Sequence, residues 1–188
     1  FVMKLFLVIT ISFYFSAINA DDFGSATGLE LPRYVSLKSD ESNLRVGPSK
    51  NYPILIKYIV DNYPLKIIEE YKDWRKIIDL NNNSGWVHKS IIKSERYGIT
   101  SNNDDKNIYI HNTKAGKIIG EINSNLVVYL SKCKIDWCLV SRDNHKGWIK
   151  KEFIWGVKKN EVFNIRFFQI FIDYYFKSLN YLEEYFSK

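Results

Sequence analysis

Short stretches in which apolar and polar positions alternate run along most of the chain. Leu65 and Ile67 flank a lysine, and Val128 and Leu130 flank a tyrosine. Alternation with a period of two is typical of short antiparallel strands that bury one face, and clusters of Asn, Ser and Gly interrupt it as turns do. Before residue 158 almost nothing has the spacing of a helix. The pattern predicts a mainly β protein.

The same pattern occurs twice. Residues 73–92 contain Asp-Trp-Arg-Lys-Ile followed by Gly-Trp-Val-His-Lys-Ser-Ile-Ile, and residues 136–154 contain Asp-Trp-Cys-Leu-Val followed by Gly-Trp-Ile-Lys-Lys-Glu-Phe-Ile. Four of the five tryptophans therefore fall in matching frames. Each copy of about 55 residues has room for four or five strands, which suits a small β-barrel. The repeat predicts two such barrels in tandem.

Polar segments divide the chain into these units. Residues 81–85 and 142–147 are rich in Asn, Asp and Gly, and they connect the two tryptophan strands of each copy as hairpin turns. Residues 94–106 are rich in Ser, Asn and Asp, so we expect a linker there. We accordingly assign residues 31–93 to the first barrel and residues 107–157 to the second.

The C-terminal segment has a different period. Within residues 158–188 the apolar positions recur at steps of four and three, which predicts a C-terminal amphipathic α-helix. Three roles remain open for this helix: docking on the barrels, self-association into a homo-oligomer, and attachment to a membrane surface. Its apolar stripe consists of Phe168, Ile172, Tyr175, Leu179, Leu182 and Phe186.

The N-terminal residues 1–20 have the order of a secretory signal peptide. A short basic start at Lys4 precedes an uncharged apolar run, and small residues lead up to Ala20. The apolar run is shorter than the roughly 20 residues that a membrane-spanning helix needs. We expect cleavage after Ala20 and a periplasmic or secreted protein, and an uncleaved anchor is the alternative.

The charge of the chain is mildly basic, with a formal net charge of +6. The Lys and Arg residues are scattered and form no run, which is typical of a solvated surface rather than a nucleic-acid interface. Together with export, this distribution makes us expect no nucleic-acid partner.

Cys133 and Cys138 are the only cysteines. They flank a predicted turn, so they would face each other across a hairpin at a distance that a disulfide can bridge. In an exported protein an even number of cysteines is typical of disulfide bonding. Two thiols without clustered histidines do not suit a zinc site, and the spacing is not that of a redox motif. We predict a structural disulfide.

Several motifs together resemble the bacterial SH3 domain family, in the tandem form found in exported proteins of Gram-negative bacteria. The first copy opens with Asn-Leu-Arg-Val-Gly-Pro at residues 43–48 and continues with the Asp-Trp-Arg and Gly-Trp-Val-His motifs. The second copy has Asn-Ile-Tyr-Ile-His-Asn at residues 107–112 instead and is divergent. The resemblance covers residues 31–157, and it implies two tandem SH3-like β-barrels that bind peptides or cell-wall material.

Aromatic side chains are the candidate ligand-binding groups, because SH3-type barrels bind extended peptides along aromatic-lined grooves. The Gly-Trp residues Trp86 and Trp148 are more often needed to fill such small barrels, whereas the Asp-Trp residues lie next to turns, where core and surface roles are both open. An arginine in the opening motif could meet a ligand carboxylate or brace its own loop. The candidates are Trp74, Tyr52, Tyr71 and Arg45 in the first copy and Trp137 and Tyr109 in the second.

The sequence contains no recognisable catalytic motif. It has no nucleophile elbow, no metalloprotease helix motif and no phosphate-binding loop, and its three histidines have no spacing that suggests a nucleophile–base pair. We therefore expect no enzyme activity, no metal and no cofactor. We expect a binding protein for a peptide, a peptidoglycan-type ligand or an envelope protein. The alternative is a scaffolding envelope protein that self-associates or docks a partner through its C-terminal helix.

Overall fold

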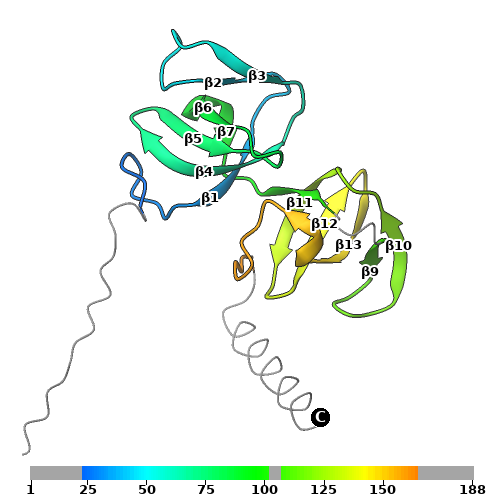
Figure 1. Cartoon of the computed structure of the whole chain (residues 1–188). Helices are drawn as coiled ribbons and strands as arrows, with labels where there is room; N and C mark the ends of the chain where they lie inside the picture. The colour runs from blue at the N-terminus through cyan, green and yellow to red at the C-terminus, as the bar shows by residue number, and fades with distance from the viewer. Residues whose placement is uncertain (1–22, 102–106, 165–188) are drawn as a thin grey trace, which may run out of the picture.

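The computed structural model describes residues 23–101 and 107–164 (Figure 1). The predicted signal peptide lies outside these residues, and so does most of the segment predicted as a C-terminal helix. The part of that segment that is described, residues 158–164, contains no α-helix. No helix within the described ranges has the length and apolar character to span a membrane.

The first barrel is an antiparallel sheet of seven strands in the order β3-β2-β6-β5-β4-β1-β7. A short 3-10 helix, Lys89–Ile91, precedes its last strand. The strands are β1 (Arg33–Leu37), β2 (Ser42–Arg45), β3 (Ile54–Tyr58), β4 (Pro64–Tyr71), β5 (Trp74–Ile78), β6 (Ser84–His88) and β7 (Ile92–Lys93).

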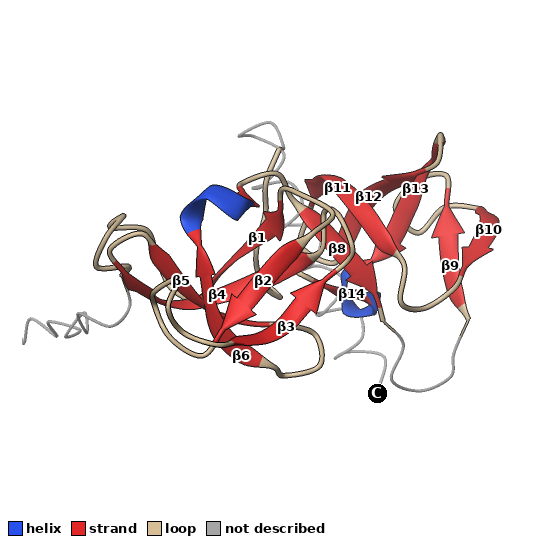
Figure 2. Cartoon of the chain, turned by 90° about the horizontal axis from the view of Figure 1, so that it is seen from above, coloured by secondary structure: helices blue, strands red, loops and turns tan. Residues whose placement is uncertain are grey.

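The second barrel repeats this topology, in the order β10-β9-β13-β12-β11-β8-β14. A 3-10 helix, Lys151–Phe153, again precedes the last strand. The predicted mainly β tandem arrangement is therefore confirmed (Figure 2). The strands are β8 (Tyr97–Thr100), β9 (Ile108–His111), β10 (Ile118–Ile122), β11 (Val127–Cys133), β12 (Trp137–Arg142), β13 (His145–Lys150) and β14 (Ile154–Trp155).

Strand β8 corrects the predicted linker at residues 94–106. Tyr97–Thr100 pairs with β11, and Ile99 is only 2% exposed within the second barrel. Tyr, Ile and Thr all favour strands, but the Ser, Asn and Asp residues around this short run hid it in the sequence. The second sheet therefore begins ten residues earlier than residue 107, where we expected it.

Alternate strand residues build a separate apolar core in each barrel. Leu65 and Ile67 of β4 are fully buried in the first core, and Val128 and Leu130 of β11 are 1% exposed in the second, as the alternation predicted. Such side chains stabilise the fold by about 1.5–3 kcal/mol each relative to an exposed position.

The Gly-Trp tryptophans do not fill the barrels as we expected. Val87 and Ile149, the residues that follow them, belong to the apolar cores and are fully buried. Because successive strand residues point to opposite faces, Trp86 and Trp148 point away from the cores. Trp86 is nevertheless buried, with the Lys76 ammonium 5.9 Å from its ring centroid.

The two barrels touch each other directly. The ring of Tyr34 in β1 meets the ring of Trp155 in β14 edge-on at 5.3 Å, and the Tyr97 amide donates to the hydroxyl of Ser36 at 3.3 Å. Gly156 has φ +112°, and a side chain there would begin 2.9 Å from the carbonyl oxygen of Tyr97 in the second barrel and 3.3 Å from Pro64 in the first, so only glycine fits between them.

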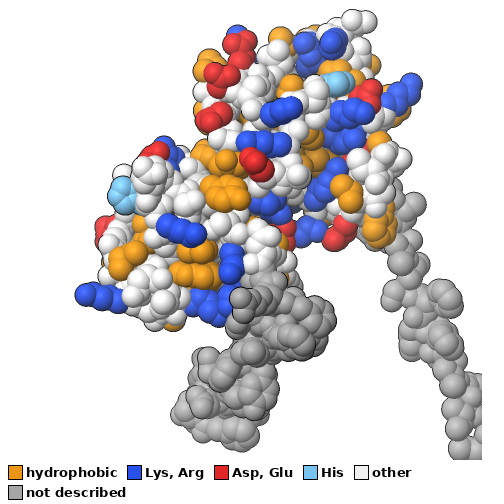
Figure 3. Space-filling view, turned by 180° about the vertical axis from the view of Figure 1, so that it is seen from behind, with side chains coloured by type: hydrophobic (Ala, Val, Ile, Leu, Met, Phe, Trp, Pro, Cys, Tyr) orange, Lys and Arg blue, Asp and Glu red, His pale blue; other side chains and the backbone are white. Residues whose placement is uncertain are grey.

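Lys and Arg side chains are spread over both barrels with Asp and Glu among them on the face seen in Figure 3. They form no single continuous basic patch on that face. The scattered charge pattern of the sequence therefore extends to this surface.

Candidate functional site

A hollow lined by aromatic rings lies at one end of the first barrel, with a volume of about 450 Å³. Tyr52 comes from the loop between β2 and β3, Tyr71 ends β4, and Trp74 begins β5. Tyr52 is 46% exposed and Tyr71 is 49% exposed, whereas Trp74 is half-buried. We call this site the aromatic hollow, and its remaining walls are Pro48, Ser49, Lys72 and Asp73.

A second hollow of about 300 Å³ adjoins the aromatic hollow through Trp74, which lines both. Arg45 and Lys50 contribute basic groups to this neighbouring hollow, and Glu41 contributes an acidic one. His88 packs edge-on against Trp74 with ring centroids 5.2 Å apart. The four candidates predicted in the first barrel therefore surround two adjacent hollows.

The position of Tyr52 depends on a glycine and an arginine. A side chain at Gly47 would begin 2.7 Å from the Tyr52 ring, so the ring occupies the space that the glycine leaves open. Arg45 donates from Nη1 to the carbonyl oxygen of Tyr52 at 2.8 Å. Arg45 thus braces its own loop and also lines the neighbouring hollow, so the structure is compatible with both roles that the sequence left open.

Tyr71 and Trp74 are paired across a tight turn between β4 and β5. Lys72 in this turn has a left-handed backbone, with φ +50°. Arg75 donates from Nη1 to the carbonyl oxygens of Lys72 at 2.8 Å and Trp74 at 2.9 Å. The guanidinium therefore fixes the turn that presents both rings.

Glu70 holds this arginine in place, and sequence reasoning missed it. Its carboxylate lies 3.2 Å from Nε of Arg75 and accepts from Nη2 of Arg33 at 2.5 Å. It also accepts from the Ala26 amide at 3.0 Å and from the amide and hydroxyl of Thr27. Burial alone would raise the pKa of Glu70, but the hydrogen bonds from Arg33, Thr27 and Ala26 outweigh burial and hold the pKa below its usual range.

An exposed ion pair forms the outer rim of the aromatic hollow. Asp73 accepts from the Lys89 ammonium at 2.8 Å, and this contact lowers the pKa of Asp73. Lys72 lies with its ammonium 5.4 Å from the centroid of the Tyr71 ring. The rim therefore carries both signs of charge around an apolar floor.

The candidates of the second barrel are not arranged like those of the first. Trp137 lines a different hollow of about 620 Å³ with more charged residues, among them Asp136, Lys150 and Glu152, and Tyr109 is not among the residues that line it. His111 packs edge-on against Trp137 with ring centroids 4.9 Å apart. Tyr109 lies 41% exposed on β9 opposite Glu121.

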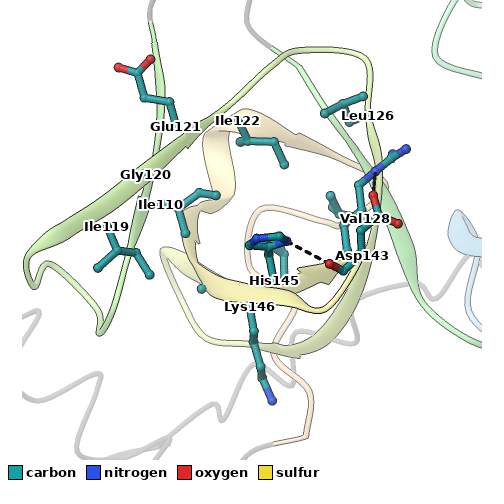
Figure 4. Close-up of a pocket in the computed structure, with 13 residues that line it drawn as sticks. Ile110, Ile119, Gly120, Glu121, Ile122, Leu126, Val128, Asp143, His145 and Lys146 are labelled. Atoms are coloured by element: carbon teal, nitrogen blue, oxygen red, sulfur yellow. Dashed lines mark hydrogen bonds and ion pairs between the residues drawn. The ribbon is translucent and has the colours of Figure 1, made fainter.

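The second barrel also contains an apolar hollow of about 420 Å³ that sequence reasoning missed (Figure 4). Ile110, Ile122 and Val128 point into it, while Glu121 and Lys146 point away from its centre. The sequence signal that could have indicated it is Gly120, a small residue within a strand. We call this site the apolar hollow, and its walls also include Ile119, Leu126, Val140, Arg142, Asp143, His145 and Gly147.

The predicted disulfide is present. Cys133 and Cys138 face each other on β11 and β12, with Cα atoms 4.1 Å apart, and both are fully buried. Within the part of the chain that the structure describes, no group of three or more His, Cys, Asp or Glu side chains could hold a metal ion.

Comparison with protein families gives a match to the bacterial SH3 domain, at residues 38–93 and again at residues 103–156. These two segments fall in the two barrels, which also include β1 and β8, and together they cover more than half of the chain. No curated protein matches the chain.

Three solved structures are similar over part of their length. NlpC2 from Trichomonas vaginalis is 12% identical with a TM-score of 0.30, over 71% of this chain and 51% of that one. NlpC1 from the same organism is 14% identical with a TM-score of 0.28, over 70% and 48%. An NlpC/P60 family protein from Bacillus cereus is 12% identical with a TM-score of 0.29, over 64% and 55%. The chain thus spans about half the length of these proteins, and such TM-scores support no inference about function.

Proposed function

Because this chain belongs to the bacterial SH3 domain family, whose model matches both of its barrels, we propose that it is a non-enzymatic binding protein with a cell-wall-associated role. Its first barrel holds an extended peptide or a peptidoglycan-type ligand in the aromatic hollow. The observation that carries this proposal is the convergence of Tyr52, Tyr71 and Trp74, from three separate elements, on one hollow.

The exposure of these rings supports a ligand. Tyr52 and Tyr71 leave almost half of their surface in water although Gly47, Arg45 and Arg75 fix the backbone around them. Rigid aromatic rings with one free face offer a ligand a large apolar contact at low entropic cost. A preformed aromatic-lined groove is the feature by which SH3-type domains take extended peptides.

The adjoining hollow gives the ligand a second point of contact. Trp74 separates the two hollows, so an extended chain that crosses it can place one group on each side. The neighbouring hollow has two basic side chains, Arg45 and Lys50, and one acidic side chain, Glu41, which itself pairs with Lys57 at 2.6 Å. The excess of positive charge favours a carboxylate there, a group that peptides and the stem peptides of peptidoglycan both carry.

A periplasmic or secreted location fits this role. The buried disulfide between Cys133 and Cys138 is typical of an oxidising compartment outside the cytoplasm. The alternative role as a self-associating scaffold depends on a helix within residues 158–188, which is mostly outside the described residues, and it stays a prediction.

Retention of the purified protein on peptidoglycan sacculi tests the proposal. We expect Trp74→Ala to lower retention by at least about tenfold, because loss of a central tryptophan typically removes much of the binding energy of a site. Trp137→Ala is the matched control, since Trp137 holds the same position in the second repeat but lines another hollow. Retention that is unchanged by Trp74→Ala, or reduced equally by both substitutions in folded protein, would overturn the assignment to the aromatic hollow.

A further inference from the structure

The two barrels can be compared residue by residue because their strand registers match. Trp74 and Trp137 begin equivalent strands, so Asp79, the residue after β5, corresponds to Arg142 at the end of β12. Ile56 in β3 lies opposite Leu44, and Gly120 in β10 lies opposite Ile110. The remaining equivalent pairs at this end of the barrels are Tyr58 with Ile122 and Tyr63 with Leu126.

In the first barrel two tyrosine rings fill this end. Tyr58 is 8% exposed and stacks on Tyr63 with ring centroids 5.4 Å apart. Its hydroxyl donates to Oδ2 of Asp79 at 3.0 Å, and Asp79 is itself only 2% exposed. The chain therefore provides its own aromatic plug, with a buried polar partner for the phenol.

The second barrel has lost this plug. Aliphatic side chains, Ile122 and Leu126, replace the two tyrosines, and Gly120 replaces Ile56. A Cβ atom added at Gly120 would meet no other atom within 4 Å, so the space beside it is open. Figure 4 shows the apolar hollow of about 420 Å³ that these differences leave in the second barrel. By strand register it corresponds to the place of Tyr58 and Tyr63 in the first barrel.

The lining of the apolar hollow defines the chemistry of its occupant. The surface that lines it is mostly apolar, and Ile119 in its wall is 55% exposed, so an apolar group that covers this surface removes it from water. The charged lining residues balance, since Arg142 and Lys146 stand against Glu121 and Asp143. An uncharged group is therefore favoured.

The hydrogen-bonding group at one end of the site is an acceptor, Asp79, in the first barrel and a donor, Arg142, in the second. Arg142 stands where the first barrel has Asp79, and its guanidinium donates to the carbonyl oxygen of Val127 at 2.9 Å and to Asp143 at 3.1 Å. A phenol oxygen that enters the hollow can accept a hydrogen bond from such a donor. The first barrel shows that rings fit this end of the fold.

We propose that the apolar hollow of the second barrel binds an uncharged aromatic ring of the tyrosine type from a partner molecule. The ring replaces the plug that Tyr58 and Tyr63 supply within the first barrel. This site lies in a different barrel from the aromatic hollow and uses none of its residues, so the two proposals stand independently.

Titration of the ¹⁵N-labelled full chain with p-cresol, the side chain of tyrosine, tests the proposal by NMR. We expect chemical-shift changes centred on Ile122, Val128 and Val140. Ile122→Tyr restores a ring of the chain itself, and Gly120→Ile fills the open space, so each should weaken p-cresol binding by at least about tenfold. Ile118→Tyr is the matched control, since Ile118 lies on the same strand but does not line the hollow, and it should leave the affinity unchanged.

Two further ligands distinguish the source of the ring. The peptide Gly-Gly-Tyr-Gly-Gly should bind, and its counterpart with alanine in the centre should not, if the ring belongs to a polypeptide. Binding of p-cresol without binding of the tyrosine peptide assigns the hollow to a small phenolic molecule. The proposal is overturned if p-cresol causes no shifts, or if the shifts are centred on Tyr52, Tyr71 and Trp74. It is also overturned if folded Gly120→Ile protein binds p-cresol with the affinity of the unsubstituted protein.

Discussion

The two barrels close the same hairpin position with different chemistry. In the first barrel Glu70 faces Arg75 across β4 and β5 as a buried ion pair, and in the second barrel Cys133 faces Cys138 across β11 and β12 as a disulfide. Both pairs have the same spacing from the Asp-Trp motif. The same strand topology thus accommodates either an ion pair or a disulfide at this position of the hairpin.

A flanking segment docks at this position in each barrel. Residues 25–27 bind Glu70 through the hydroxyl of Ser25, the amide of Ala26 and both groups of Thr27. In the second barrel the backbone of Phe163 exchanges two hydrogen bonds with Cys133, at 3.1 and 3.3 Å. Because only the ion pair is held by side-chain charge, the two closures should respond differently to substitution, pH and reductant.

The largest expected effect is that of Glu70→Gln. Loss of the carboxylate leaves the buried Arg75 and the half-buried Arg33 without their anionic partner, which should destabilise the first barrel by about 3–5 kcal/mol. Urea unfolding measures this change. Glu69→Gln is the matched control, because Glu69 forms an exposed pair with Lys76 and should cost about 1 kcal/mol or less. Equal effects of the two substitutions would show that the buried network contributes no more than a surface pair.

Acid should weaken the same closure. Since the folded-state pKa of Glu70 is lowered, its stabilisation is fully present above the unfolded pKa of about 4.3 and is lost as the pH falls through the folded pKa. The loss should be smaller than that of Glu70→Gln at neutral pH, because a protonated carboxyl group has one O–H donor, whereas the glutamine amide has two N–H donors among the donor groups that surround Glu70. The free energy of unfolding should therefore change less between about pH 3 and pH 7 for Glu70→Gln than for the unsubstituted protein. An equal change in both proteins would contradict this explanation.

Removal of the disulfide should have the next largest effect. The bridge joins residues five apart in sequence, so Cys133→Ala with Cys138→Ala should destabilise the second barrel by about 2 kcal/mol through the regained entropy of a short loop. Thermal unfolding with and without reductant measures it. Reductant should lower the midpoint of the unsubstituted protein and leave that of the double variant unchanged; a midpoint insensitive to reductant in both would refute a stabilising bridge.

The smallest effect is expected for Tyr58→Phe. This substitution keeps the ring that fills the first barrel and removes only the hydrogen bond to Asp79. Asp79 retains the amides of Asn81 and Asn83 as partners, so the cost should be about 1 kcal/mol. Urea unfolding should show this change, whereas Tyr58→Ile, which copies the second barrel, should cost more because it also removes the ring. If the two substitutions lowered the free energy of unfolding equally, the aromatic ring of Tyr58 would contribute nothing to the stability of the first barrel.

The strands, the tandem repeat and the disulfide could be predicted because each follows from residues that are close together in the sequence. The alternation at Leu65 and Ile67 reports directly which face is buried, so the strands and the tandem repeat were predictable. The same alternation places Trp86 and Val87 on opposite faces of their strand. We nevertheless expected Trp86 to fill the barrel because of its size, and this expectation did not take the alternation into account. The pairing of Cys133 with Cys138 followed from their positions across one hairpin.

The parts that sequence reasoning missed depend on contacts between distant segments or on missing volume. Glu70 meets Thr27 and Arg33 over separations of 43 and 37 residues, and no local pattern links them. The apolar hollow arises because Gly120 and Ile122 are small for their positions, which becomes visible only when both barrels are superposed by register. The grouping of Tyr52 with Trp74 depended on the family resemblance rather than on spacing.

The direct contact between the barrels has a consequence for polymeric ligands. Tyr34, Trp155 and Gly156 hold the two units against each other, so the hollows of the two barrels keep a set separation and orientation. If one polymer carries the groups that both proposed sites take, its binding at the aromatic hollow raises its effective concentration at the apolar hollow, provided that the spacing of these groups matches that separation. The contact at Gly156 would thereby select ligands by the spacing of their binding groups as well as by the chemistry of those groups.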